Sequence, residues 1–234
     1  MNKKKLLALS LVLILVATAS FGTLAWFNDS DSVTNTFKVA TTVDGDPSDP
    51  DDIFSVDVWE EVPDGDDDGE EPDKDQDGQE FENILPGATL DKKPVVENTG
   101  AYDQYVRVVV TLGDANAWVN ILGYGYDLST IFIDHDEDLW TRVDGSHDST
   151  NDQLVYSYYL NKVLKPGETA VLFDGVKLPT TLTQEDLAKL NGGFDLTIRA
   201  DAIQTENLGD GVVTAQQAFA VANWGSIANT KPQP

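Results

Sequence analysis

The feature that most constrains the fold is a series of short β-forming segments separated by turn residues. Residues 105–112 read Tyr-Val-Arg-Val-Val-Val-Thr-Leu, the strongest strand signal in the chain, and residues 154–160 are a tyrosine-rich strand pattern. Residues 194–204 alternate apolar and polar positions, as a strand with one buried face does. Many short strands with few helices predict an all-β fold, an antiparallel β-sandwich of jelly-roll type.

One hairpin is predicted from the turn Asn98-Thr99-Gly100. This turn separates a candidate strand at residues 89–97 from the strong strand at 105–112. Pro94 lacks a backbone N–H, so it makes the first of these strands an edge strand or a broken one.

Turn and cap signals place most other elements. A strand at 139–143 is expected to lead into a polar turn at 144–148. Thr183 is expected to cap a short helix with Asp186 at the capping-box position, and Thr214 begins a second helix. Shorter strands are expected at 53–59, 169–173 and 176–178, while residues 118–140 give an ambiguous pattern.

The start of the chain has the pattern of a secretory signal peptide. Three lysines precede an apolar run at residues 6–25, which ends in Thr23-Leu24-Ala25. Cleavage after Ala25 would leave Trp26 as the first residue of an exported protein. The run is also long enough to cross a bilayer, so an uncleaved membrane anchor is the alternative. Residues 26–228 are then one sandwich domain, and residues 229–234 are a disordered tail.

Charge and cysteine content exclude several functions. The chain has 41 Asp and Glu against 15 Lys and Arg, a formal net charge of −26, which repels phosphate backbones and anionic lipid. We therefore expect no nucleic-acid partner and no stable membrane insertion after cleavage. Because there is no cysteine, disulfides, thiol catalysis and thiolate metal sites are excluded. No organic cofactor is expected either.

Much of the acidity lies in an insertion at residues 43–82. Within it, Asp73, Asp75 and Asp77 precede Gly78 with the spacing that opens a calcium loop. The twelfth position of such a loop should be a bidentate acid, and here it is Ile84, so Glu80 or Glu82 would have to substitute with a different loop geometry. The alternatives are a calcium site and an uncoordinated acidic loop.

An N-terminal strand is predicted at residues 32–40. Val33, Phe37 and Val39 alternate with polar neighbours there. A strand in this position can pair within its own sheet or reach into another molecule. These three side chains are therefore the candidate assembly residues.

Six short motifs lie at both ends and in the middle of the chain. They are Leu24-Ala25-Trp26-Phe27, Leu85-Pro86-Gly87, Asn98-Thr99-Gly100, Tyr105-Val106-Arg107-Val108, Val163-Leu164-Lys165-Pro166-Gly167 and Ala200-Asp201-Ala202-Ile203-Gln204. Together they resemble the TasA and camelysin (CalY) family, exported Gram-positive proteins with a SipW-type signal peptide.

The resemblance implies a jelly-roll sandwich, processing by a dedicated signal peptidase, and, in the matrix members, fibres built by donating an N-terminal strand to the next subunit. The partners it implies are further copies of the chain and other matrix or cell-surface proteins. The acidic insertion is where this chain departs most from the matrix members.

Enzymatic sites are poorly supported. His135 and His147 have acidic neighbours, but the chain has no His-Glu-x-x-His motif and no Gly-x-Ser-x-Gly elbow. The aromatic residues form either a sugar-binding face or, as strand alternation favours, part of the core; they are Trp118, Tyr124, Tyr126, Trp140, Tyr156, Tyr158 and Tyr159.

The sequence therefore predicts a secreted, non-enzymatic structural protein of the extracellular or cell-surface matrix. Two other functions stay open. One is a camelysin-like metalloendopeptidase, motivated by the family resemblance, and the other is a calcium-dependent adhesin or carbohydrate-binding module that uses the acidic insertion.

Overall fold

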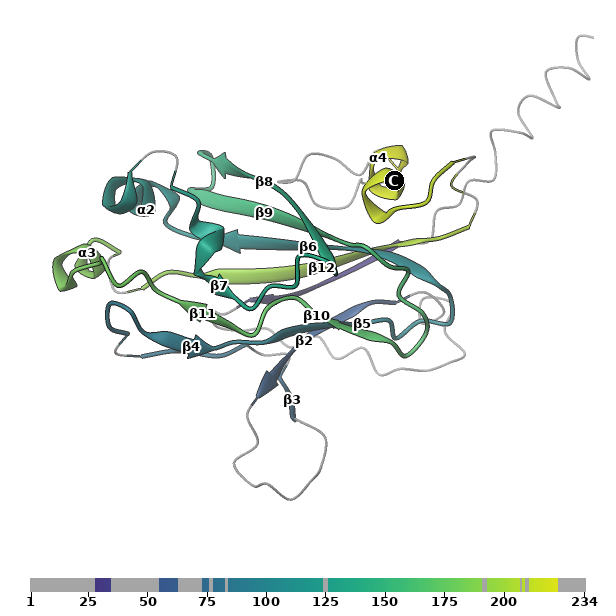
Figure 1. Cartoon of the computed structure of the whole chain (residues 1–234), viewed down its shortest axis with the longest axis horizontal. Coiled ribbons are helices and arrows are strands. Elements are labelled where there is room, and N and C mark those ends of the chain that lie inside the picture. The colour runs from purple at the N-terminus through teal and green to yellow at the C-terminus, as the bar shows by residue number, and fades with distance from the viewer. Residues whose placement is uncertain are drawn as a thin grey trace, which may run out of the picture.

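The computed structural model describes residues 28–34, 55–62, 73–75, 78–82, 84–123, 126–190, 193–206, 208 and 211–222. They form a sandwich of two antiparallel β layers (Figure 1). The predicted all-β sandwich is thus confirmed, while the jelly-roll connectivity stays a prediction.

The first layer is one five-stranded sheet, here called sheet A. Every neighbouring pair in it is antiparallel. In spatial order its strands are β1 (Asn28–Thr34), β12 (Leu196–Gln204), β6 (Gln104–Leu112), β9 (Gln153–Leu160) and β8 (Trp140–Asp148).

The second layer contains two smaller sheets, B and C. Sheet B has the order β10 (Thr169–Val171), β5 (Pro94–Glu97), β2 (Asp57–Val62) and β3 (Asp73–Asp75). Sheet C has the order β4 (Thr89–Asp91), β11 (Gly175–Lys177) and β7 (Phe132–Ile133).

Sheets B and C share one continuous register. Val95 pairs with Val171 in sheet B, and Asp91 pairs with Gly175 in sheet C, so β4–β5 and β10–β11 are two collinear lines of chain. The Leu172 N–H donates to the Pro94 carbonyl at 3.0 Å between the two sheets. The strand predicted at residues 89–97 is therefore broken near Pro94, as one of the two sequence alternatives had it, and it is not an edge over its β5 half.

The predicted hairpin around Asn98-Thr99-Gly100 is wrong. β5 lies in sheet B and β6 in sheet A, so this turn carries the chain from one layer to the other. The cause is the Asn98 side chain, which donates to the Leu164 and Tyr102 carbonyls, both at 2.8 Å. These bonds tie the turn to the loop after β9 and direct the chain away from β5.

The predicted turn at residues 144–148 is also wrong, because these residues belong to β8. The strand pairs with β9 on both sides of an irregularity between Val143 and Ser146. A bulge accommodates the glycine and polar residues that signal a turn in the sequence. Close approach explains Gly145, because a Cβ there would lie 2.5 Å from Cε1 of Tyr156.

The helices are short and peripheral. They are α2 (Ala115–Leu122), α3 (Gln184–Ala188) and α4 (Ala215–Val221), with a 3₁₀ turn η1 (Leu128–Ile131). The capping box at Thr183 and Asp186 is confirmed, and Thr214 caps α4 by accepting from the Gln217 N–H. Helix α2 resolves part of the ambiguous middle of the chain. None of the described helices is long and apolar enough to cross a membrane.

The core lies between the layers. From sheet A it receives Val106, Val108 and Val110, which are fully buried and alternate along β6. The expectation that most of the aromatics belong to the core is confirmed for Trp118, Trp140, Tyr156 and Tyr158, whereas Tyr159 is half-buried, Tyr126 is exposed and Tyr124 lies outside the described residues.

Helix α4 covers the outer face of sheet A (Figure 1). Ala215, Ala218 and Phe219 pack there with Tyr105 and Ile203 in a second, smaller apolar cluster. The side of sheet A that faces away from the sandwich core is therefore partly shielded from solvent.

Candidate functional site

The candidate assembly site is the edge of sheet A formed by β1. Among the strands that the structure describes, β1 pairs with β12 alone in sheet A, in an unbroken antiparallel register from Asn28↔Ile203 to Thr34↔Thr197. It starts four residues earlier than the strand predicted at 32–40. The N-terminal segment thus holds an edge position that another strand can occupy by the same main-chain bonds.

Of the predicted assembly residues, the structure places one. Val33 pairs with Ile198, a fully buried core residue of β12. Phe37 and Val39 lie outside the described residues, as do Ala25 and Trp26 at the predicted cleavage point.

The strand beneath β1 is firmly held on its other side. β12 pairs with β6 over nine residues, and Ile198, Ala200 and Ala202 are all fully buried in the core. An exchange of β1 would therefore leave an ordered acceptor edge with apolar residues at alternate positions.

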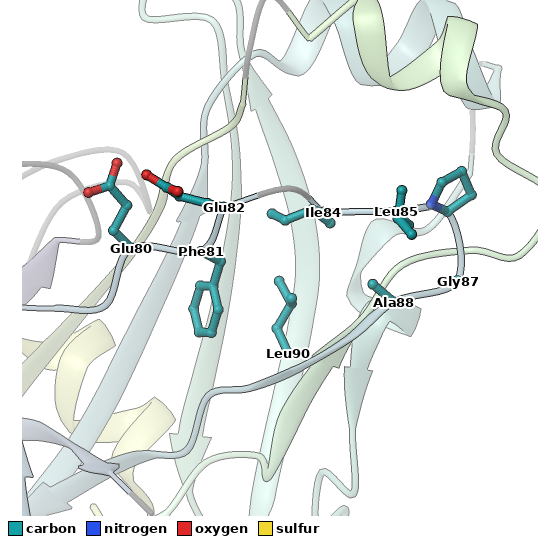
Figure 2. A pocket seen from close by; sticks show the side chains of 9 residues that line it. Glu80, Phe81, Glu82, Ile84, Leu85, Gly87, Ala88 and Leu90 are labelled. Carbon is teal, nitrogen blue, oxygen red and sulfur yellow. The ribbon is translucent and has the colours of Figure 1, made fainter.

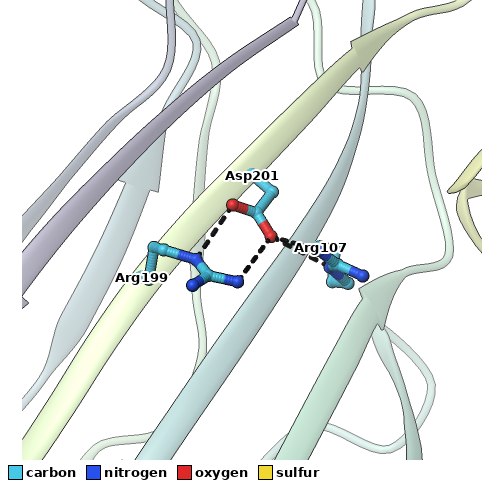
Figure 3. Close-up of polar contacts among 3 residues, drawn as sticks. All are labelled: Arg107, Arg199 and Asp201. Carbon is cyan, nitrogen blue, oxygen red and sulfur yellow. Dashed lines mark hydrogen bonds and ion pairs between the residues drawn. The ribbon is translucent and has the colours of Figure 1, made fainter. Parts of the chain in front are cut away.

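An ion-pair cluster connects β12, the strand next to this edge, to β6 (Figure 3). Asp201 of β12 is 1% exposed, and it accepts from Arg107 of β6 at 2.5 and 3.0 Å. Arg199 contacts the same carboxylate at 3.0 and 3.3 Å. Arg107 also lies 4.7 Å from the ring centre of Phe219 in α4. The cluster locks β12, β6 and α4 together.

The structure describes only part of the predicted calcium loop. Asp73 and Asp75 lie in β3, which pairs with β2, so the first three positions of the supposed loop are an extended strand. Glu82 is exposed, and Asp77 lies outside the described residues. In the part of the chain that the structure describes, no three acids or histidines come together as a metal site. Calcium binding stays a prediction.

The end of the acidic insertion is pinned to sheet B. Lys74 of β3 pairs with Glu97 at 2.6 Å, and its Nζ lies 4.9 Å from the ring centre of Trp59. The Trp59 indole N–H donates to the same Glu97 carboxylate at 3.2 Å. Lys74, which lies between the acidic residues of the insertion, thus neutralises the charge of Glu97 in β5.

The two histidines lie at different places. His135 follows β7 and makes an edge contact with Tyr158, with the ring centres 5.0 Å apart. Burial lowers the pKa of His135 below its ordinary value, despite the charges of Glu137 and Asp136, which raise it. His147 lies in β8. Neither histidine belongs to a ligand group among the described residues.

A polar cluster between η1 and β8 had no signal in the sequence. Arg142 donates to Asp127 at 2.9 Å and to the Ser129 hydroxyl at 2.6 Å. Burial raises the pKa of Asp127, but the Ser129 hydrogen bonds and the charge of Arg142 outweigh it, so the pKa is lowered. Burial raises the pKa of Tyr156 and Tyr158 nearby. These partners are distant in sequence, so only the fold identifies the cluster.

A shallow groove of about 530 Å³ runs beside β4 (Figure 2). Phe81, Ile84, Leu85 and Leu90 give it an apolar lining, and Leu85 is 58% exposed. Glu80 and Glu82 lie at one end of the groove. Their carboxylates and the Phe81 ring point to opposite sides of the backbone (Figure 2). No sequence pattern indicates this groove, because its two walls are a turn and a short strand.

No protein-family model, curated protein or solved structure matches this chain.

Proposed function

We propose that this protein is an exported, non-enzymatic structural subunit of a Gram-positive cell surface or biofilm matrix, which assembles into fibres by exchanging β1. The observation that carries the proposal is the place of β1 at the edge of sheet A, where β12 is its one partner among the described strands of that sheet. A second copy can offer the same segment to the same edge without any new kind of contact.

The energetics favour exchange over a new interface. When β1 of one copy replaces β1 of another, the hydrogen bonds to β12 are the same in both arrangements, so the enthalpy of pairing changes little. The acceptor also needs no rearrangement, because β6 and the Arg107–Asp201 ion pair hold β12 in place. A rigid acceptor reduces the entropic cost of association.

The motifs that resemble the TasA and camelysin family support this proposal through their position. Arg107 of the Tyr-Val-Arg-Val motif meets Asp201 of the Ala-Asp-Ala-Ile-Gln motif in the buried ion pair. The Asn98 turn hydrogen-bonds to the loop that holds Lys165-Pro166-Gly167, since the Gly167 N–H donates to the Asn98 carbonyl at 2.8 Å. The motif residues therefore lie within sheet A, which contains the acceptor strand β12, and at the turn that precedes β6.

A disulfide experiment tests the exchange, because the chain has no cysteine of its own. Thr34 and Thr197 are register partners in β1 and β12, so Thr34→Cys with Thr197→Cys should cross-link under mild oxidation. In monomers the link stays within one chain. In fibres we expect a ladder of covalent oligomers on a non-reducing gel.

Deletion of residues 26–40 is the companion test, read by electron microscopy of the purified protein. Exchange is supported if the deletion abolishes fibres and the full-length Thr34→Cys, Thr197→Cys variant forms links between chains. Fibres that form as readily after the deletion, or that contain only links within chains, would disprove it. Mass spectrometry of the exported protein should find Trp26 as its first residue, and an intact chain retained in the membrane would contradict export by cleavage.

A further inference from the structure

The side of β4 that faces away from β11 is an open strand edge. The Leu178 N–H donates to the Ala88 carbonyl at 2.9 Å, so the backbone groups of Ala88 and Leu90 face β11. By the antiparallel alternation, those of Thr89 and Asp91 face the other way. Within the described ranges of the chain, no strand pairs with that side of β4.

β2 explains why this edge is open. It covers the same side of the collinear strand β5, and its Glu61 N–H donates to the Lys93 carbonyl at 3.0 Å. β2 ends at Val62, and the next described strand, β3, pairs with the side of β2 that faces away from β5. The ladder position beside β4 is thus one that β2 would fill if it continued in a straight line.

The groove lies along this open edge. Leu90 is its β4 member, and Phe81, Ile84 and Leu85 form the apolar wall opposite (Figure 2). Its surroundings are acidic, because Glu80 and Glu82 belong to one wall and Asp91 follows Leu90 on the other, and all three are exposed. An extended segment that fits must offer alternating apolar residues and positive charge.

Residues 35–40 have this chemistry. Their sequence is Asn-Thr-Phe-Lys-Val-Ala, in which Phe37 and Val39 alternate with Lys38, and no acid is present. The segment follows β1 directly, and β1 runs toward the end of the sandwich at which β4 lies (Figure 1).

We propose that residues 35–40 of a second copy add as a strand to β4, with Phe37 and Val39 in the groove and Lys38 near Asp91. The inference rests on the proposed strand exchange and extends it. The exchanged segment then occupies two edges of one acceptor, β12 through residues 28–34 and β4 through residues 35–40. Main-chain bonds to Thr89 and Asp91 set the register, and the groove selects the side chains.

Cysteine pairs test the location. Lys38→Cys is combined in one chain with Asp91→Cys or with Thr89→Cys, which are exposed positions of β4. The matched control is Lys38→Cys with Lys177→Cys, which is exposed on the neighbouring strand β11, one strand spacing farther from the open edge. In assembled protein we expect links between chains for a β4 position and none for the control.

The outcomes separate this inference from strand exchange itself. If Thr34→Cys with Thr197→Cys links chains but neither β4 position does, the groove assignment is wrong and the exchange stands. Links from Lys38→Cys to β4 within one chain would overturn the second copy as the occupant. If neither pair links chains, both proposals fail.

A peptide of residues 33–40 gives a second measurement that does not depend on the folding of a variant. It should bind the mature protein, and a Phe37→Ala peptide should bind at least about tenfold more weakly, because the buried ring is lost. Equal binding of the two peptides would overturn the proposed role of the groove.

Discussion

The two layers of the sandwich differ in continuity. Sheet A is one ladder of five strands, and its central pair β6–β12 is unbroken over nine residues. The second layer keeps a single register but is interrupted between sheets B and C, where Lys92 lies. Each layer buries an ion pair, Arg107–Asp201 in sheet A and Lys92–Glu60 in the second layer. The continuous sheet thus holds its buried ion pair between two long paired strands, whereas the interrupted layer holds its ion pair next to the break and leaves an open edge at β4.

The largest effect should come from Asp201→Asn. The substitution keeps the volume but removes the carboxylate that Arg107 and Arg199 share, and Arg107 is only 2% exposed. We expect the free energy of unfolding to fall by about 3–5 kcal/mol in urea denaturation. The matched control Asp103→Asn, at an exposed position just before β6, should change it by under about 0.5 kcal/mol. A loss below about 1 kcal/mol for Asp201→Asn would mean that the ladder does not depend on this pair.

A smaller loss is expected for Glu60→Gln in the second layer. Lys92 donates to Glu60, and both side chains are buried, so the change leaves the ammonium group without its carboxylate. Because the strand break lets the backbone adjust, we expect about 2–3 kcal/mol in the same assay. Glu60→Leu combined with Lys92→Met should recover most of it, since both charges of the buried pair are then removed.

The comparison between the layers would fail if Glu60→Gln cost more than Asp201→Asn. Lys93→Met is the control beside the break. Lys93 pairs with Glu61 at 2.7 Å while 33% exposed, so its removal should cost under about 1 kcal/mol.

The smallest effect concerns α3, which links the second layer to sheet A. The Lys189 hydrogen bond, followed by those of Thr183, lowers the pKa of Asp186 to about 2 from 3.8. The carboxylate form is favoured by the fold, so its contribution is complete above pH 3.8 and is lost as the pH falls through about 2. An NMR titration of the Asp186 carboxyl should show this value.

Lys189→Met should raise the pKa of Asp186 toward 3.8 without moving the layers. An unchanged pKa in that variant would assign the shift to Thr183 and the backbone instead. A change confined to the pKa of Asp186 would show that the contacts of α3 act locally and do not stabilise the sandwich.

Local pattern was sufficient for the elements whose environment is simple. The strands at β6, β9 and β12 and the capped starts of α3 and α4 follow from side-chain alternation and from Thr183 and Thr214. Pairing between strands did not follow, because Asn98 directs the chain by bonds to Leu164, which is distant in sequence. Within the candidate site, the sequence indicated Val33, but it gave no sign of the Arg107–Asp201 pair or of the β4 groove, which require the assembled layers.

The position of β1 has a consequence for the order of events during synthesis. Its partner β12 is the last of the described strands in chain order. Val33 therefore cannot pair with Ile198 until nearly the whole chain has been synthesised. Contacts between such distant parts of a chain form slowly. Under the proposed strand exchange, a neighbouring molecule can capture β1 during that interval, so the local concentration of chains, rather than the strength of binding, would decide whether a chain closes on itself or joins another.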